Sequence, residues 1–394
     1  MAKSAGADIK NAKSVGLDPD ALARLKKAVE RDTSEGLYDG AVFLVARGGS
    51  VAMHEAVGYT DLENKRAAKK DDAFFIMSIT KQLTTTIVLS RIDRGELSLT
   101  TRIADIIPEF GKKGKQRITV QHLLTHMSGI STEMPFGLPL DQVGDLQAYV
   151  AAACEQRLLS TPGKGVSYNP FTAHAILAET VRRLEGGKRP FRQILAEDLF
   201  EPLGMKDTSM GLRPDLAERR VPVVVRDLTP GLFEPALLEA TNILLTNETE
   251  IPAGGVFSTA YDIYRFSEML RRGGELDGVR ILSPGIVKLA TTNQTGTHRN
   301  DLFDYAREEY GWPEFPAYIG LTFFLRGEGV FPTHLGTTTS PGTFAGLGAG
   351  STLFWVDPER DLTFVCLTAG LLEEIASALR FQRLSDMVVA AVMD

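Results

Sequence analysis

The chain has few of the residues that bind metal ions or form disulfide bonds. It contains two cysteines, Cys154 and Cys366, and six histidines in 394 residues. Each cysteine lies inside an apolar segment without a histidine or second cysteine at metal-site spacing, so we expect both to be reduced core residues. The motif His-Glu-x-x-His is absent. These absences disfavour a zinc hydrolase, and we expect no metal and no cofactor.

Basic charge and long apolar runs are also scarce. The net charge is −7, and the run Lys112-Lys113-Gly114-Lys115 is short enough for a solvated loop, so nucleic acid is not expected as a partner. No apolar run approaches the length needed to cross a bilayer, and residues 1–8 form no apolar signal segment. We therefore expect a cytoplasmic protein without a membrane partner, and nothing in the pattern indicates an oligomeric state.

Three familiar motifs are missing. Gly-x-Ser-x-Gly, the nucleophile turn of α/β-hydrolases, does not occur. The glycines and lysines of 111–115 lack the P-loop spacing and its Ser or Thr. The glycine-rich run 346–350 lacks the preceding strand and following helix of a dinucleotide-binding unit.

The apolar patterning predicts strands near both ends of the chain and helices between them. Asp18-Pro19 has the form of a helix start, and Gly48-Gly49 has that of a hairpin turn. The expected strands are 40–47, 51–59, 319–325, 351–356 and 362–368, and the expected last helix is 374–392. This order predicts an α+β fold, in which an antiparallel sheet is flanked by helices and carries an inserted, mostly helical domain.

The same pattern divides the chain into lobes. Residues 1–17 are expected to be a flexible leader. Residues 18–84 and 253–394 would form an α/β lobe around the sheet, and residues 85–252 would form a helical lobe. A site would lie in the cleft between the lobes, with the irregular segment 212–252 as a cover.

Ser78-Ile79-Thr80-Lys81 is the single Ser-x-x-Lys sequence of the chain, and it opens an apolar helical pattern that ends at Gly95. Positions three apart share a helix face, so Ser78 and Lys81 would point the same way. A lysine held neutral by burial can deprotonate a serine and make it a nucleophile. The same spacing also fits an N-cap serine followed by a surface lysine. His126 is a weaker candidate base, because no carboxylate near it in sequence would orient it.

Several further segments accompany this motif in a fixed order. They are His122-Leu-Leu-Thr-His-Met-Ser-Gly129, Pro162-Gly163 before Tyr168, Phe200-Glu-Pro-Leu-Gly-Met205, Ala253-Gly-Gly255, Ser258-Thr-Ala-Tyr-Asp262 and Phe354-Trp-Val-Asp-Pro358. With these segments the chain resembles the serine β-lactamase-related superfamily over about residues 20–390. It is most similar to the branch of class C β-lactamases and family VIII carboxylesterases. The resemblance implies a β-lactamase/transpeptidase-like fold.

The resemblance also implies roles for individual residues. Ser78 would be the acylated nucleophile, with Lys81 and Tyr168 as base and acid. A nearby ammonium would favour the Tyr168 phenolate. Backbone N–H groups of Ser78 and Ala349 would form the oxyanion hole.

Two departures from the family pattern bear on the substrate. The third motif would fall on Gly346-Leu347-Gly348, with His334-Leu335-Gly336 as the competing position, and Gly346 has no side chain to hold a carboxylate. In the second motif, Pro170 stands where β-lactamases have an Asn that holds the substrate amide, and Asn169 could replace it only in a rotated loop. Both departures point toward neutral esters.

We therefore expect a serine carboxylesterase that acts on a small-molecule ester through a Ser78 acyl-enzyme. The alternatives are an acyltransferase with the same acyl-enzyme, an amidase or β-lactam hydrolase, and a non-catalytic scaffold. We expect an apolar pocket for the acyl or alcohol group, and the candidates to line it are Phe136, Phe233, Tyr261, Tyr310, Trp312 and Phe344.

Overall fold

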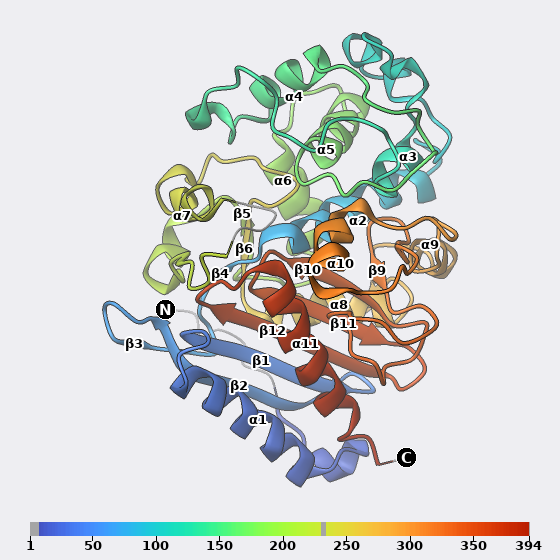
Figure 1. Ribbon diagram of the computed structural model, residues 1–394. Coiled ribbons are helices and arrows are strands. Elements are labelled where there is room, and N and C mark those ends of the chain that lie inside the picture. The colour runs from blue at the N-terminus through green and yellow to red at the C-terminus, as the bar shows by residue number, and fades with distance from the viewer. Residues whose placement is uncertain (1–7, 230–233, 394) are drawn as a thin grey trace.

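One antiparallel sheet forms the centre of the protein. The computed structural model describes residues 8–229 and 234–393 (Figure 1). The seven strands have the order β3-β2-β1-β12-β11-β10-β9. They are β1 (Gly40–Arg47), β2 (Ser50–Asp61), β3 (Arg66–Ala67), β9 (Phe324–Leu325), β10 (Phe344–Gly348), β11 (Thr352–Asp357) and β12 (Leu362–Ala369). Because β1 pairs with β12 along its whole length, both ends of the chain build the same sheet, as predicted.

The other elements pack on this sheet or lie to one side of it (Figure 1). The α-helices are α1 (Pro19–Ser34), α2 (Thr80–Asp93), α3 (Val120–Leu124), α4 (Leu146–Glu155), α5 (Thr172–Leu184), α6 (Phe191–Leu195), α7 (Pro235–Leu244), α8 (Ala260–Arg271), α9 (Pro284–Ala290), α10 (Asp304–Tyr310) and α11 (Glu374–Val389). The short 3₁₀ helices are η1 (Ala12–Val15), η2 (Met77–Ile79), η3 (Ile103–Asp105), η4 (Pro108–Gly111), η5 (Lys115–Arg117), η6 (Leu140–Gln142), η8 (Pro214–Arg219) and η9 (Asp301–Phe303). A short π-helix, η7 (Ala196–Phe200), follows α6. The short strands are β4 (Phe74–Phe75), β5 (Ser209–Met210), β6 (Val256–Ser258), β7 (Glu275–Leu276) and β8 (Val279–Arg280).

Helices cover both faces of the sheet (Figure 1). Phe43 and Val45 of β1 pack into a core shared with α1 and α11. Val42 and Leu44, which alternate with them, pack into the larger core. This core is shared with α8 and with α3 to α6 and η3 to η7, here called the helical block. Because both faces are buried, β1 is a continuous apolar run rather than an alternating one.

The strand predicted over 319–325 is wrong. The structure forms only the two-residue strand β9 in that segment. Thr322 has a φ of 73°, a left-handed value that interrupts an extended strand. Its hydroxyl donates to the Leu124 carbonyl at 3.1 Å, so the bend is fixed by a contact that is distant in sequence.

The expected flexible leader is also wrong within its described part. Ala12–Val15 form η1, and Leu17 is fully buried and pairs with Val392. This contact ties the start of α1 to the end of α11. Residues 1–7 lie outside the described residues.

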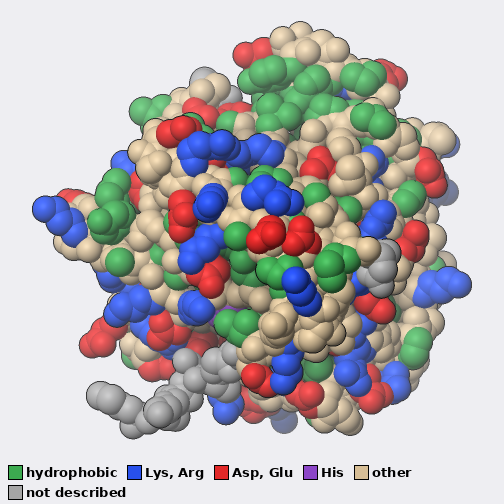
Figure 2. Space-filling model, turned by 90° about the horizontal axis from the view of Figure 1, so that it is seen from below, with side chains coloured by type: hydrophobic (Ala, Val, Ile, Leu, Met, Phe, Trp, Pro, Cys, Tyr) green, Lys and Arg blue, Asp and Glu red, His purple; other side chains and the backbone are tan. Residues whose placement is uncertain are grey.

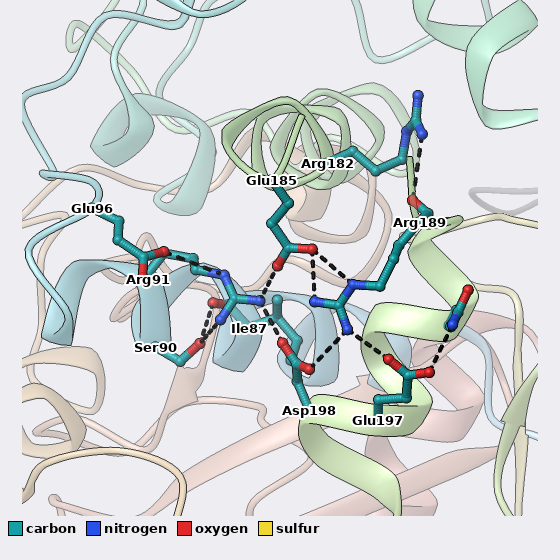
Figure 3. A network of polar contacts seen from close by, with 10 residues as sticks. Ile87, Ser90, Arg91, Glu96, Arg182, Glu185, Arg189, Glu197 and Asp198 are labelled. Carbon is teal, nitrogen blue, oxygen red and sulfur yellow. Dashed lines mark hydrogen bonds and ion pairs between the residues drawn. The ribbon is translucent and has the colours of Figure 1, made fainter. Parts of the chain in front are cut away.

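The expected lobe boundary between residues 84 and 85 falls inside α2. The helix runs without interruption from Thr80 to Asp93, and all its side chains through Arg91 are buried. Arg91 joins the far end of α2 to α5 and η7, because it contacts Glu185 and Asp198 at 2.5 Å each (Figure 3). The helix that carries Lys81 is therefore shared between the sheet and the helical block.

The two cysteines are free and buried, as predicted. Within residues 8–229 and 234–393, no three His, Cys, Asp or Glu side chains are grouped as a metal site requires. No helix in the described part of the chain has both the length and the apolar character to cross a bilayer. On the face shown in Figure 2, basic and acidic side chains are intermingled.

Candidate active site

Ser78 lies in a turn that is held from both sides. The Ile76 N–H donates to the Val256 carbonyl at 3.0 Å, and the Val256 N–H donates to Thr80 Oγ1 at 3.2 Å. Met77 adopts a φ of 51°, which is strained for a residue with a side chain. The strained residue turns the chain from β4 into η2, so that half-buried Ser78 stands immediately before α2.

Lys81 is placed to act as the base for Ser78. Its Nζ lies 2.9 Å from Ser78 Oγ and donates to the Ala253 carbonyl at 2.8 Å. The side chain is 1% exposed, and burial holds the pKa of the Lys81 amine well below its ordinary value. Both partners are uncharged, so the site favours the neutral amine, which can accept a proton. The alternative of a surface lysine is wrong.

Tyr168 completes the group around Ser78. The centroid of its ring lies 5.2 Å from Lys81 Nζ. Burial raises the pKa of the Tyr168 phenol above its ordinary value, and a hydrogen bond with Ser78 lowers it by less. The expectation of a phenolate is therefore wrong, because the amine beside the ring is itself favoured as the neutral form. Tyr168 can donate or relay a proton as a neutral phenol.

The end of β10 lies against the nucleophile turn. A Cβ added at Gly348 would lie 2.5 Å from the Ile76 carbonyl and 1.9 Å from Thr352 Oγ1, so a side chain there has no room. Thr352 Oγ1 also donates to the Ile76 carbonyl at 3.0 Å. Ala349, which follows Gly348, borders the same two pockets as Ser78.

The third-motif positions differ in what they can contact. Gly346, Leu347 and Gly348 lie on β10, whereas His334 lies in a turn outside the strands. A Cβ at Gly346 would lie 2.6 Å from Gln82 Oε1 and 2.4 Å from a Phe354 ring carbon. Gln82 therefore fills the space in which a longer third-motif side chain would lie.

Asn169 does not take the substrate-binding role considered for it. Its Nδ2 donates to the Ser131 carbonyl at 2.7 Å, and its Oδ1 accepts from the Ala173 N–H at 2.9 Å. Both ends of the amide thus hold the loop and the start of α5. The neighbouring Pro170 borders a pocket at Ser78 and presents an apolar wall there.

A layer of uncharged polar residues lies behind Tyr168. His126 Nδ1 accepts from the Asn169 N–H at 3.0 Å, and burial lowers the pKa of His126 to about 3, so it supports the loop as a neutral ring. His174 Nε2 lies 3.3 Å from Thr85 Oγ1. Neither His174 nor the Ala253 carbonyl was predicted from the sequence as part of the site. The Ala253-Gly254-Gly255 segment was the one available signal for the carbonyl.

Two pockets meet at Ser78. The first, here the α7 pocket, has a volume of about 830 Å³, part of it open to solvent, and is bordered by Met77, Pro170 and residues of α7. The second, here the Tyr168 pocket, has a volume of about 520 Å³ and is bordered by Tyr168, Phe303 and Phe324. The two parts of a substrate bound at Ser78 can thus lie in separate pockets.

The expected apolar pocket is present, but none of the described candidate residues borders the α7 pocket or the Tyr168 pocket. The described candidates lie elsewhere: Phe136 and Tyr310 are exposed, Tyr261 and Phe344 belong to the core, and Trp312 borders a separate cavity. Phe233 lies outside the described residues.

Comparisons with known proteins identify the family and the fold. A family model described as Beta-lactamase matches residues 25–385. The curated protein Esterase/beta-lactamase LipL of Mycobacterium tuberculosis (strain H37Rv) is 26% identical over 366 residues, covering 86% of this chain and 79% of LipL. A penicillin-binding protein homologue from Caulobacter crescentus has a TM-score of 0.79 at 25% identity, covering 95% of this chain and 99% of that one. A family VIII carboxylesterase has a TM-score of 0.77 at 21% identity, with the same coverage. The fold predicted from the sequence is confirmed.

Proposed function

Because the chain belongs to the Beta-lactamase family, we propose that it is a serine hydrolase that cleaves carboxylic esters through an acyl-enzyme on Ser78. One observation carries this proposal. The Lys81 amine is fully buried, is favoured as the neutral form and lies 2.9 Å from Ser78 Oγ. An amine in this state can remove the serine proton at neutral pH.

The proposed reaction has two halves, acylation of Ser78 and hydrolysis of the acyl-enzyme. Lys81 accepts the Ser78 proton as Oγ attacks the ester carbonyl, and the N–H groups of Ser78 and Ala349 stabilise the oxyanion. The alkoxide leaves with a proton from the Tyr168 hydroxyl, which is replaced from the Lys81 ammonium. Water then attacks the acyl carbon and gives a proton to Lys81. The bond between the acyl carbon and Ser78 Oγ breaks, the carboxylic acid is released, and Ser78 Oγ takes back a proton from the Lys81 ammonium.

Neutral esters fit this site better than β-lactams or peptide acids. Gly346 offers no cation for a substrate carboxylate, and Gln82 fills the adjoining space. Pro170 borders the α7 pocket with a ring that cannot hydrogen bond to a substrate amide. The name of LipL includes both esterase and β-lactamase, so this chain should be tested with the β-lactam nitrocefin as well as with esters. The features above predict negligible hydrolysis of nitrocefin.

Acyl transfer is the second candidate function. The Tyr168 pocket is bordered by Leu302, Phe303 and Phe324, which could hold an acceptor alcohol in place of water. An alcohol held there would attack the same acyl-enzyme and give a new ester.

Hydrolysis of p-nitrophenyl butyrate by the wild type and by Ser78→Ala tests the proposal. We expect measurable turnover by the wild type, loss of turnover in the folded variant, and negligible hydrolysis of nitrocefin. In a second experiment, butanol is added and the products are analysed. Butyrate indicates hydrolysis, and butyl butyrate indicates acyl transfer. Equal turnover by the wild type and by Ser78→Ala would show that Ser78 is not the nucleophile.

A further inference from the structure

The α7 pocket carries an inference about the substrate, which rests on the proposed function. We propose that this protein selects esters with an uncharged, aliphatic acyl chain of several carbons, and that leucines of α7 determine this selectivity. The Tyr168 pocket receives the alcohol.

The wall of the α7 pocket is almost entirely apolar. Its described lining residues include Met134, Leu237, Leu244 and Ile251, and the ionisable side chain among them is Asp141, which is solvent-exposed. The Thr241 hydroxyl donates to the Leu238 carbonyl of its own helix at 2.5 Å. A charged or strongly polar acyl group would lose its water there without gaining partners, whereas an alkyl chain gains from leaving water.

Helix α7 is a fixed wall of this pocket. On its other side, Asn242 Nδ2 donates to the Val223 carbonyl at 2.6 Å, and the Val223 N–H donates to Asn242 Oδ1 at 2.9 Å. The Val225 N–H donates to Glu239 Oε1 at 3.0 Å. These bonds orient the helix, so that Leu237 and Leu238 border the pocket while Ile243 is 85% exposed.

The position of Tyr168 assigns the two halves of the ester. The leaving alkoxide must receive a proton, and Tyr168, the phenol beside Ser78, borders the second pocket. The alcohol therefore lies on that side of Ser78. The acyl carbon bonded to Ser78 then extends its chain toward Met77 and α7, where the larger volume lies.

Two series of esters test the assignment on the full chain. With p-nitrophenyl esters from acetate to decanoate, we expect kcat/KM to rise roughly threefold to fourfold per methylene until the pocket is filled. With alkyl acetates from ethyl to octyl, we expect a much shallower rise. A flat acyl series, or a steeper alcohol series, would overturn the proposal while leaving Ser78 hydrolysis intact.

A pair of variants on one helix tests the role of α7. Leu237→Trp places a large ring in the pocket, so the ratio of kcat/KM for octanoate to acetate should fall at least tenfold while acetate is still hydrolysed. Ile243→Trp adds the same ring on the exposed side and should leave the ratio unchanged. Equal ratios in both variants and the wild type would contradict the proposal. If the wild type hydrolysed no ester and Ser78 took no fluorophosphonate, both this inference and the proposed function would fail.

Discussion

At the residue scale, the proposed chemistry depends on a lysine that the fold keeps out of water. Lys81 is 1% exposed, and its Nζ contacts Ser78 Oγ and the Ala253 carbonyl. A buried amine is destabilising when charged, because its lost hydration is not replaced by an opposite charge. The same burial makes the amine a base near neutral pH. Function and stability are therefore expected to oppose each other at this position.

Lys81→Met should separate these two effects. The pKa of Lys81 is lower in the folded protein than in the unfolded chain, so between these two values the unfolded chain binds more protons. The wild type consequently gains stability as pH rises through that range. The Lys81→Met variant should therefore be more stable than the wild type at pH 7, and this difference in stability should shrink toward pH 10. Its kcat/KM should fall about 10²- to 10⁴-fold. Urea unfolding at several pH values checks the sign, and a less stable variant at pH 7 would contradict it.

Tyr168→Phe tests the neutral phenol as a proton donor. Burial raises the pKa of Tyr168, so the phenol keeps its proton until the leaving group needs it. A methyl ester, whose alkoxide needs that proton, should lose about 10²- to 10⁴-fold in kcat. A p-nitrophenyl ester, whose phenolate leaves without a proton, should lose much less. Equal losses of kcat on both substrates would show that Tyr168 does not protonate the leaving group.

At the scale of elements, the site depends on how closely β10 approaches the turn before α2. The absence of a side chain at Gly348 permits that approach, since a Cβ would lie 2.5 Å from the Ile76 carbonyl. Motif spacing predicted Ser78, Lys81 and Tyr168, because those residues recur in a recognisable order. It could not predict that Asn169 holds Ser131 and Ala173, since that contact depends on how distant segments pack.

Gly348→Ala should displace β10 and with it the Ala349 N–H. We expect kcat to fall about 10²- to 10³-fold, as when one oxyanion-hole donor is removed. Gly342→Ala is the matched control near the other end of β10, because a Cβ there meets its nearest atoms, in Pro358 and Glu359, at 3.8 Å. Steady-state kinetics on p-nitrophenyl butyrate compares the two. Equal activity in both variants would mean that the approach of β10 is not needed.

At the scale of the whole molecule, ion pairs hold the helical block to α2, the helix that carries Lys81. Figure 3 shows Arg91 of α2 between Glu185 and Asp198, which Arg189 also contacts. Burial raises the pKa of Asp198, but hydrogen bonds from Arg91 and Arg189 outweigh it, and the pKa lies below its ordinary value. The stability that this carboxylate contributes is therefore present above its ordinary pKa and lost in acid.

Arg91→Met should weaken this junction without touching the chemistry at Ser78. Removing one partner of a buried pair costs up to about 3–5 kcal/mol. Arg189 still contacts Glu185 and Asp198, so we expect about 1–3 kcal/mol. The loss should diminish as pH falls and Asp198 is protonated. Arg102→Met, which breaks the exposed pair with Asp105, is the control and should change stability much less than Arg91→Met. Denaturant unfolding measures both, and equal costs would contradict a structural role for Arg91.

Intact-protein mass spectrometry after brief exposure to a fluorophosphonate, with peptide mapping of the adduct, tests most directly whether Lys81 activates Ser78. We expect one adduct, on Ser78, that forms rapidly in the wild type and far more slowly in folded Lys81→Met. No adduct on the folded wild type, or an adduct on another residue, would contradict a Ser78 nucleophile activated by Lys81.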